Sequence, residues 1–468
     1  MVSGFFWSGL LVGGFVMAAQ MRVGMDMTHG PLWNKIILYA LPLALTGMCQ
    51  QLFNAADVAV IGRFVGKEAM AAVGSNGPLI GIIVSFFMGI SIGGSVIIAQ
   101  AIGRKDDQAL SLALHTSIFI AILGGVLMAI LGEIVARPVL ILTGVPPEVL
   151  DMAELYLRIY VGGMPVILLY NFLSAIFRGQ GDSRTPLYAL LLSGMINVAL
   201  NVFFVVKLGW TVDGVATATV IANAFSSIGL LWKLHSVKGP SQFHVHLLRI
   251  DKETLRQILR LGVPSGIQNS LFSFSNIIVQ SAVNSLGATV MAASSAGFNI
   301  EIHTWFMMNA FNQAAATFTG QNYGARKAER CRSVFKLCIL ESYISTAVLI
   351  LLISFNYKFL FALFNPDPEI MRIGLVRVIY LFAANVFSVW LETGTGYLRG
   401  FGISVLPMAI AIFCVCVIRL TWVATAFQIS HTFSTLMLLY PITLGLGGIA
   451  TAIAVFWIKP SRKYIKAA

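Results

Sequence analysis

The chain has 468 residues, of which 57% are hydrophobic and only 11% charged, with 31 Lys and Arg against 19 Asp and Glu. A soluble globular protein carries about 25% charged residues, so this composition excludes a soluble enzyme, a disordered chain and a disulfide scaffold. The basic residues lie in short connections between apolar runs, so their excess indicates membrane topology rather than nucleic-acid binding. The sequence therefore predicts an all-α integral membrane protein.

Twelve apolar runs follow one another along the chain, each about long enough to cross a bilayer as a helix. The first twenty residues are a shorter apolar run without a basic leader. Because MDMTHGPLWNKI resembles a natural start, we expect the protein to begin at Met25; the alternative is an extra helix formed by these residues. The predicted spans are 36–61, 78–102, 109–136, 152–177, 185–207, 214–234, 257–285, 292–320, 333–355, 373–398, 404–428 and 436–458.

The longest polar stretch divides these spans into two sets of six. The predicted organisation is an N-terminal segment 1–34, an N-lobe 35–234, a cytoplasmic linker 235–256, a C-lobe 257–458 and a cytoplasmic tail 459–468. Most Lys and Arg fall on one side when the N-terminus is placed inside, which is the bias that orients membrane proteins. Both termini are therefore predicted to be cytoplasmic.

The two halves repeat with an offset of 221 residues. Gln100-Ala-Ile-Gly103 falls on Gln321-Asn-Tyr-Gly324, the Arg-Gly-x-Gly of 178–181 falls on that of 399–402, and Pro186 falls on Pro407. Six spans per repeat give both halves one orientation, so the predicted fold is two pseudo-symmetric six-helix bundles around a central cleft. This architecture suits alternating access, and the chain lacks a G-x-x-x-x-G-K-[ST] nucleotide motif. A secondary transporter is predicted rather than an enzyme.

Ionisable groups inside a membrane are costly and mark function. Asp57 lies near the outer end of the first span, after Pro42, which is expected to bend that helix. Asn197 and Asn201 share one face of the fifth span, and Thr219 follows in the sixth. These four polar side chains are predicted to form a site that couples transport to H⁺ or Na⁺. Alternatively, Asp57 is a helix-end residue and the others are interhelical hydrogen-bonding groups.

A second set of polar residues is predicted to line the cleft and attract cationic substrates. Glu301 lies in the eighth span and Glu392 in the tenth, where it aligns with Asn171 of the N-lobe. His303 is two residues from Glu301 and points to another helix face, so a Glu–His pair is not expected. The five cysteines lack metal-ligand spacing, and no metal site is predicted.

Several motifs together resemble the MATE (multidrug and toxic compound extrusion) family over nearly all of residues 25–460. They are MTHGPLWNKIILYALPLAL, AADVAVIGRFVG, the pair VIIAQAIGR and TFTGQNYGAR, and the pair FRGQGDSRTP and LRGFGISVLP. The resemblance implies two six-helix lobes in a V shape, exporting organic cations or drugs against H⁺ or Na⁺. It implies a monomer in the inner (plasma) membrane, with lipids as neighbours, no cofactor and no nucleic acid.

Carried over residue by residue, the resemblance places Asp57 at the family's first-helix acid and Pro42 at its helix-bending proline. It places Asn197 and Thr219 at polar positions of the fifth and sixth helices. The chain departs at Asn201, where many members carry Asp. The seventh span lacks the acid found in some members and offers Gln268 and Asn269 instead. Gln268 and Asn171 are therefore predicted, with Glu301 and Glu392, to line the substrate cleft.

Two alternatives to multidrug antiport fit the sequence less well. A flippase of lipid-linked oligosaccharide or another lipid precursor needs arginines in its cavity to hold a pyrophosphate, whereas Arg158, Arg377 and Arg419 are predicted near span ends. A membrane enzyme needs a nucleophile-base or metal cluster, and the seven histidines show no HxxxH or HxxE spacing. Both considerations favour an antiporter of cationic or neutral compounds.

Overall fold

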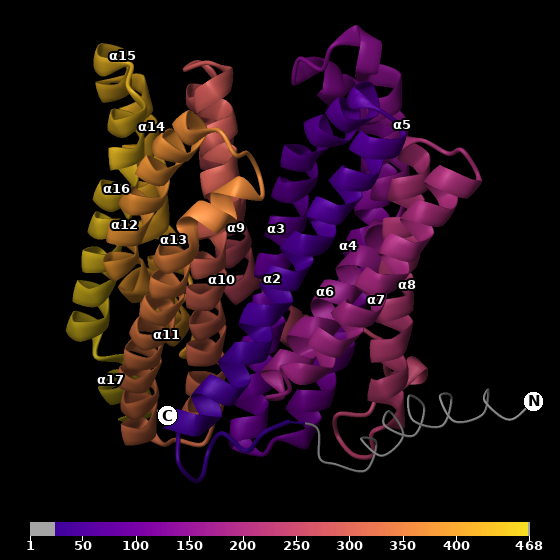
Figure 1. Cartoon of the computed structure of the whole chain (residues 1–468). Coiled ribbons are helices and arrows are strands. Elements are labelled where there is room, and N and C mark those ends of the chain that lie inside the picture. The colour runs from indigo at the N-terminus through magenta and orange to yellow at the C-terminus, as the bar shows by residue number, and fades with distance from the viewer. Residues whose placement is uncertain (1–23, 467–468) are drawn as a thin grey trace, which may run out of the picture.

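The computed structural model describes residues 24–466, which are helical except for short connections and caps. The expectation that the chain starts at Met25 concerns residues 1–23, which lie outside the described residues, as do residues 467–468 of the tail. The helices form two lobes that diverge toward the top of Figure 1. Both the start of the first described helix and the end of the last lie at the bottom, which we call the predicted cytoplasmic side.

The N-lobe comprises the first six membrane-crossing units. Its helices are α2 (Trp33–Phe64), α3 (Lys67–Arg104), α4 (Asp107–Leu142), the pair α5 (Pro147–Gly162) and α6 (Met164–Gly179), α7 (Arg184–Val202) with a π-helical turn Phe203–Lys207, and α8 (Val212–Ser236).

The C-lobe comprises the other six units. Its helices are α9 (Lys252–Asn284), α10 (Ala288–Gly324), α11 (Ala328–Ala362), α12 (Pro368–Gly400), the broken span α13 (Val405–Ile410), π-helical Ala411–Val417, α14 (Ile418–Ala424) and α15 (Ala426–Ser430), and α16 (Phe433–Ile458), followed by the short α17 (Pro460–Lys466). The twelve-helix prediction is confirmed.

The fourth predicted span is not one straight helix. α5 and α6 meet at 51°, at a point where Gly162 and Gly163 are followed by Pro165. Proline lacks a backbone N–H and crowds the preceding turn, so a helix breaks there. A hydropathy count detects the apolar run but carries no information on a bend within it.

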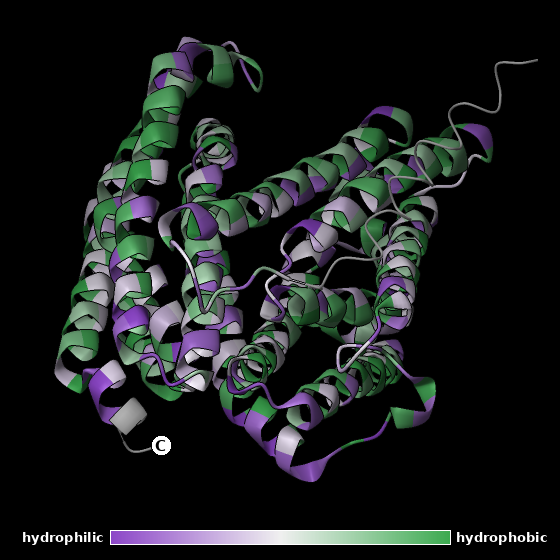
Figure 2. Cartoon of the chain, turned by 90° about the horizontal axis from the view of Figure 1, so that it is seen from below, coloured by the Kyte–Doolittle hydropathy of each residue, from purple (hydrophilic) through white to green (hydrophobic). Residues whose placement is uncertain are grey.

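The outward faces of both lobes suit a lipid environment. Large apolar side chains such as Ile134, Phe355 and Ile429 are 70–88% exposed, which water would oppose. Nine helices within residues 24–466 are long and apolar enough to span a membrane, and the α5–α6 pair makes a tenth. The two more polar units, α9 and α10, lie at the junction between the lobes. Seen from the predicted cytoplasmic side, hydrophobic colour dominates the helices and hydrophilic colour gathers on connections (Figure 2).

The lobes touch through backbone-to-backbone packing of glycines in α3 and α9. A Cβ added to Gly89 would stand 2.1 Å from the Gly266 nitrogen, and one added to Gly93 would stand 2.8 Å from the Gly262 nitrogen. Only glycine permits such an approach, as in other close crossings of membrane helices. These contacts involve the half of each helix on the predicted cytoplasmic side.

The repeated motifs meet each other at the same level. Gln100 Nε2 of α3 donates to Gly400 O of the C-lobe at 2.9 Å, and Gln321 Nε2 of α10 donates to Gly179 O of the N-lobe at 3.2 Å. The two bonds are related by the 221-residue offset. In each lobe a glutamine side chain donates a hydrogen bond to the Arg-Gly motif of the other lobe. We call them the reciprocal Gln–Gly contacts.

Tyr39 of α2 and the residues just before this helix add further hydrogen bonds between the lobes. Tyr39 Oη of α2 donates to Arg178 O at 2.8 Å and lies 3.1 Å from Thr317 Oγ1 of α10. Lys327 Nζ and Arg330 of α11 donate to backbone carbonyls of residues 27–29. The predicted cytoplasmic side is therefore closed by hydrogen bonds between the lobes, while the opposite ends of the lobes diverge.

Candidate functional site

The four residues predicted as a coupling site converge inside the N-lobe. Asn201 Nδ2 of α7 donates to Asp57 Oδ1 of α2 at 2.6 Å and also lies 3.3 Å from Asn197 Oδ1. Asn197 Nδ2 donates in turn to Thr219 Oγ1 of α8 at 3.2 Å. A single chain of hydrogen bonds thus links α2, α7 and α8, because positions 197 and 201 share one helix face.

This site is rich in oxygen atoms and poor in positive charge. Asp57 makes no ion pair within the described residues, and Asn201, which is fully buried, keeps its Oδ1 without a hydrogen-bond partner. Asp57 is half-buried, and a partly desolvated carboxylate without a cation favours taking up a proton or binding a metal cation. Carboxylate, amide and hydroxyl oxygens are ligands that hard cations prefer. The residues present therefore fit either H⁺ or Na⁺.

Two tyrosines of α5, which the sequence analysis did not single out, stand near this carboxylate. Tyr156 and Tyr160 lie close enough to Asp57 to feel a negative charge on it, and their rings stack at a centroid distance of 6.1 Å. Their i, i+4 spacing on one apolar helix is the only sequence signal, and it is equally typical of packing. Only the fold brings these two tyrosines near Asp57.

Pro42 lies inside α2, which continues unbroken through it, with Thr46 Oγ1 donating to Pro42 O at 2.7 Å. One and a half turns before Asp57, Gln51 Nε2 lies 3.4 Å from Asn299 Oδ1 of α10. A Cβ on Gly47 would stand 2.3 Å from the Phe306 ring. The helix that carries Asp57 therefore also contacts the C-lobe.

The predicted cleft residues do not form one cluster. Glu392 Oε2 accepts from Asn312 Nδ2 at 2.7 Å, and Gln268 Oε1 accepts from Arg399 Nη2 at 2.9 Å. Glu392 and Arg399 interact electrostatically, so Glu392 and Gln268 belong to one polar group joining α9, α10 and α12. Asn171 stands apart in the N-lobe, where its amide donates to Ile167 O of its own helix.

Glu301 has a different partner. Its Oε1 lies 3.1 Å from Arg377 Nη2, and both side chains are buried. Arg419 is also buried, at 3% exposure, in the middle of its span. The prediction that Arg419 lies near a span end is wrong, because it stands in the middle of Val405–Ser430. Arg377 lies nine residues after the start of α12, and both side chains are buried among the C-lobe helices. His303 lies on another face, with its Nδ1 3.4 Å from Ile300 O of the same helix.

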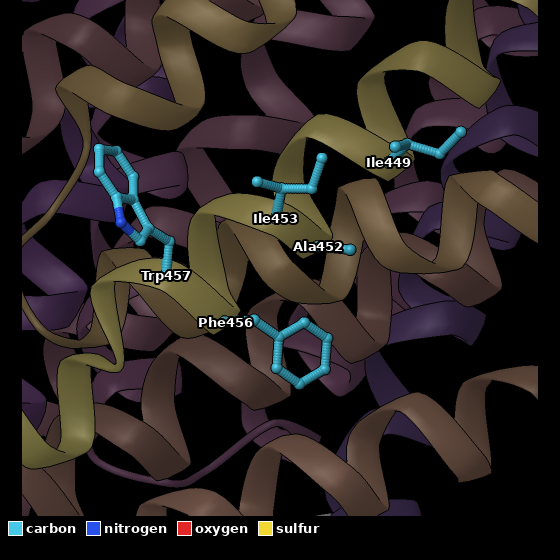
Figure 3. A pocket seen from close by; sticks show the side chains of 5 residues that line it. All are labelled: Ile449, Ala452, Ile453, Phe456 and Trp457. Atoms are coloured by element: carbon cyan, nitrogen blue, oxygen red, sulfur yellow. The ribbon is translucent and has the colours of Figure 1, made fainter.

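A shallow apolar depression on α16 is separate from these polar groups. It is lined by Ile449, Ala452, Ile453, Phe456 and Trp457, whose side chains project from one helix (Figure 3). Trp457 is 85% exposed. Such an apolar, open surface suits lipid chains, and none of its residues is charged.

The comparison with protein families decides the identity of this architecture. The MatE family model matches the chain twice, over residues 42–203 and 264–424. The chain belongs to the MatE family. One match falls within each lobe, which confirms the internal repeat read from the sequence.

Relatives of this MatE protein span most of its length. It is 32% identical over 410 residues to the "Probable multidrug resistance protein YoeA" of Bacillus subtilis, covering 86% of this chain and 87% of that one. It is 27% identical over 391 residues to the "Probable multidrug resistance protein NorM" of Thermotoga maritima, covering 83% and 84%. It is 23% identical over 354 residues to a "FAD transporter" of Shewanella oneidensis, covering 74% and 77%.

A solved structure has the same fold. The "outward-facing conformation of a multidrug resistance MATE family transporter of the MOP superfamily" superposes with a TM-score of 0.85 at 22% identity and covers 96% of this chain and 99% of that chain. The protein is therefore a multi-pass membrane transporter with the MATE architecture.

Proposed function

We propose that this transporter exports organic, often cationic, compounds in exchange for H⁺ or Na⁺, with Asp57 as the coupling carboxylate. The observation that carries the proposal is the Asp57–Asn201 contact of 2.6 Å in a site that offers oxygen ligands and no cationic partner within residues 24–466. The names of the Bacillus and Thermotoga relatives support drug-like substrates. The protein is proposed to act as a monomer in the inner membrane with both termini cytoplasmic.

The proposed cycle uses α2 as the link between the ion site and the lobe junction. When Asp57 takes up H⁺ or Na⁺, its charge is neutralised and its bond from Asn201 weakens. We expect α2 to shift in response. Gln51 lies on the same helix, six residues or about 9 Å along its axis from Asp57. A shift of α2 therefore alters the contact of the N-lobe with α10 and opens the lobes alternately.

The test is efflux of ethidium from proteoliposomes under an imposed pH gradient or an imposed Na⁺ gradient. Asp57→Asn should abolish gradient-driven efflux, because the amide cannot exchange a proton or carry negative charge. Asp107→Asn is the matched control, since Asp107 is an exposed first-turn residue of α4. The gradient that drives the native protein identifies the ion, and unchanged efflux by Asp57→Asn would refute the proposal.

Export of a lipid-linked precursor is the second candidate, and one observation favours it. Arg377 and Arg419 lie inside the C-lobe, so the shortage of interior arginines no longer counts against a phosphate-bearing substrate. A fluorescent phospholipid reconstituted in the same proteoliposomes separates the candidates. Faster quenching by an external reductant in the presence of the protein, without ethidium efflux, would favour lipid translocation.

A further inference from the structure

Two arginines of the C-lobe flank one tyrosine. Arg377 of α12 and Arg419 of α14 place their guanidinium carbons 5.7 Å and 4.9 Å from the ring centroid of Tyr440 of α16. Arg377 is 5% exposed and Arg419 3% exposed. Two like charges are thus held close together inside a membrane domain, where an unmatched charge is costly and marks function.

The charges of this group do not balance. Arg377 donates to Glu301 Oε1 at 3.1 Å and to Ser294 Oγ at 3.0 Å, so one positive charge is neutralised. Arg419 donates to Asn276 Oδ1 at 2.8 Å and has no ion pair within residues 24–466. The Nε–H groups of both arginines are buried without an acceptor. The charge of Arg419 and the Nε–H donors of both arginines could therefore be matched by an anionic acceptor.

Under the internal repeat, this group occupies the position in the C-lobe that is equivalent to the proposed ion site of the N-lobe. With the 221-residue offset, Tyr156 corresponds to Arg377 and Thr219 to Tyr440, while Arg419 follows the position that corresponds to Asn197. Tyr156, Asn197 and Thr219 all belong to the surroundings of Asp57. The two lobes therefore carry polar sites at equivalent places but of opposite sign.

The group reaches the surface at two points. Asn276, which accepts from Arg419, is exposed on α9. Phe298 of α10 is 37% exposed and lies with its ring 5.2 Å from the Arg377 guanidinium carbon. On α9, Asn276 lies one turn beyond Ser273, whose hydroxyl is 3.3 Å from Ser85 of the N-lobe. A ligand held between the lobes would thus meet this group first through Asn276.

We propose that Arg377, Tyr440 and Arg419 form a binding site for an anionic group, with Asn276 at its entrance. The ligand is a carboxylate or phosphate carried by a transported compound, or a free halide. The first source rests on the proposed transport function, whereas the second does not. Guanidinium groups bind carboxylate and phosphate oxygens through charge-assisted hydrogen bonds, and their positive charge also attracts a halide.

The test measures binding of carboxyfluorescein to the purified full-length protein in detergent micelles by fluorescence anisotropy, with chloride and inorganic phosphate as competitors. Arg419→Gln should weaken dye binding by about ten- to a hundredfold, the range for loss of a bond to a charged group. Arg419→Lys, which keeps the charge, should lose less. Arg372→Gln is the control, because Arg372 is an exposed residue of the same helix as Arg377.

A second variant avoids removing a buried side chain. Asn276→Asp introduces a carboxylate beside Arg419 at an exposed position. This carboxylate should neutralise the Arg419 charge in place of the ligand and so weaken dye binding at least tenfold. Size-exclusion profiles and thermal unfolding of each variant show whether it folds.

The outcomes separate the two sources. Competition by phosphate but not by chloride identifies the ligand as an oxygen anion like that of the dye, and competition by chloride identifies it as a free halide. Absence of dye and anion binding, or equal binding by the native protein, Arg419→Gln and Asn276→Asp, would overturn the proposal. Failure of ethidium efflux in proteoliposomes would refute the antiport function and leave the micelle result standing.

Discussion

Replacing both Gln100 and Gln321 by alanine is expected to loosen the closed predicted cytoplasmic side. Each glutamine donates one buried bond to a carbonyl of the opposite lobe, at 2.9 and 3.2 Å. Such a bond contributes about 1 kcal/mol net. Because these bonds exist only while the lobes touch, their loss shifts the equilibrium toward separation by about 2 kcal/mol, or roughly 30-fold.

The assay is maleimide labelling of a cysteine at Thr317, which is 4% exposed and contacts Tyr39 across the lobes. The five native cysteines are first replaced by alanine. The double variant should label roughly 30-fold faster, and each single variant about fivefold faster, because labelling follows the population of the open form. Gln257→Ala is the control, since Gln257 is exposed and bonds only to Glu253 of its own helix.

A labelling rate that does not change in a well-folded double variant would refute this reasoning. It would mean that the glycine packing of α3 against α9 holds the lobes together without help from the reciprocal Gln–Gly contacts.

Two other substitutions test the packing. Gly89→Val should destabilise the junction by more than about 3 kcal/mol, because its Cβ would stand 2.1 Å from the Gly266 nitrogen. Thermal unfolding in detergent checks this against Gly74→Val, a site on α3 with no neighbour within 4 Å. Glu301→Gln should cost about 3–5 kcal/mol by leaving Arg377 buried and unpaired. The double variant with Arg377→Met should recover most of that loss, and a double variant as unstable as the single one would contradict the ion-pair interpretation.

Much of the fold could be predicted because a membrane helix is a local feature of sequence. An apolar run of about twenty residues has few alternatives in lipid, where the backbone must satisfy its own hydrogen bonds. Gly and Pro at a constant offset revealed the repeat, since glycine recurs where backbones meet: Gly103 and Gly324 both lie at the lobe junction. The bend at Gly163 escaped prediction because hydropathy carries no information on helix direction.

The candidate ion site was predictable for a similar reason. Asn197 and Asn201 are four residues apart, so they share a helix face whatever the tertiary structure. Asp57 attracted notice as an acid in an apolar run. That Asn201 is the residue that meets Asp57, at 2.6 Å, required the packing of α2 against α7.

The sequence alone thus determined the membrane class, the span count, the repeat and the polar candidates of the N-lobe. These features depend on composition, on apolar runs and on residue spacing, and not on which helices pack together. The positions and partners of Glu301, Arg377 and Arg419 became clear only from the tertiary structure. The sequence shows each of them as an isolated charge near an apolar run, and a charge of that kind can sit at a membrane edge or inside a bundle. Helices α9, α10, α12, α14 and α16 bring their partners together. The cost of burying a charge depends on those partners and not on its neighbours in the chain.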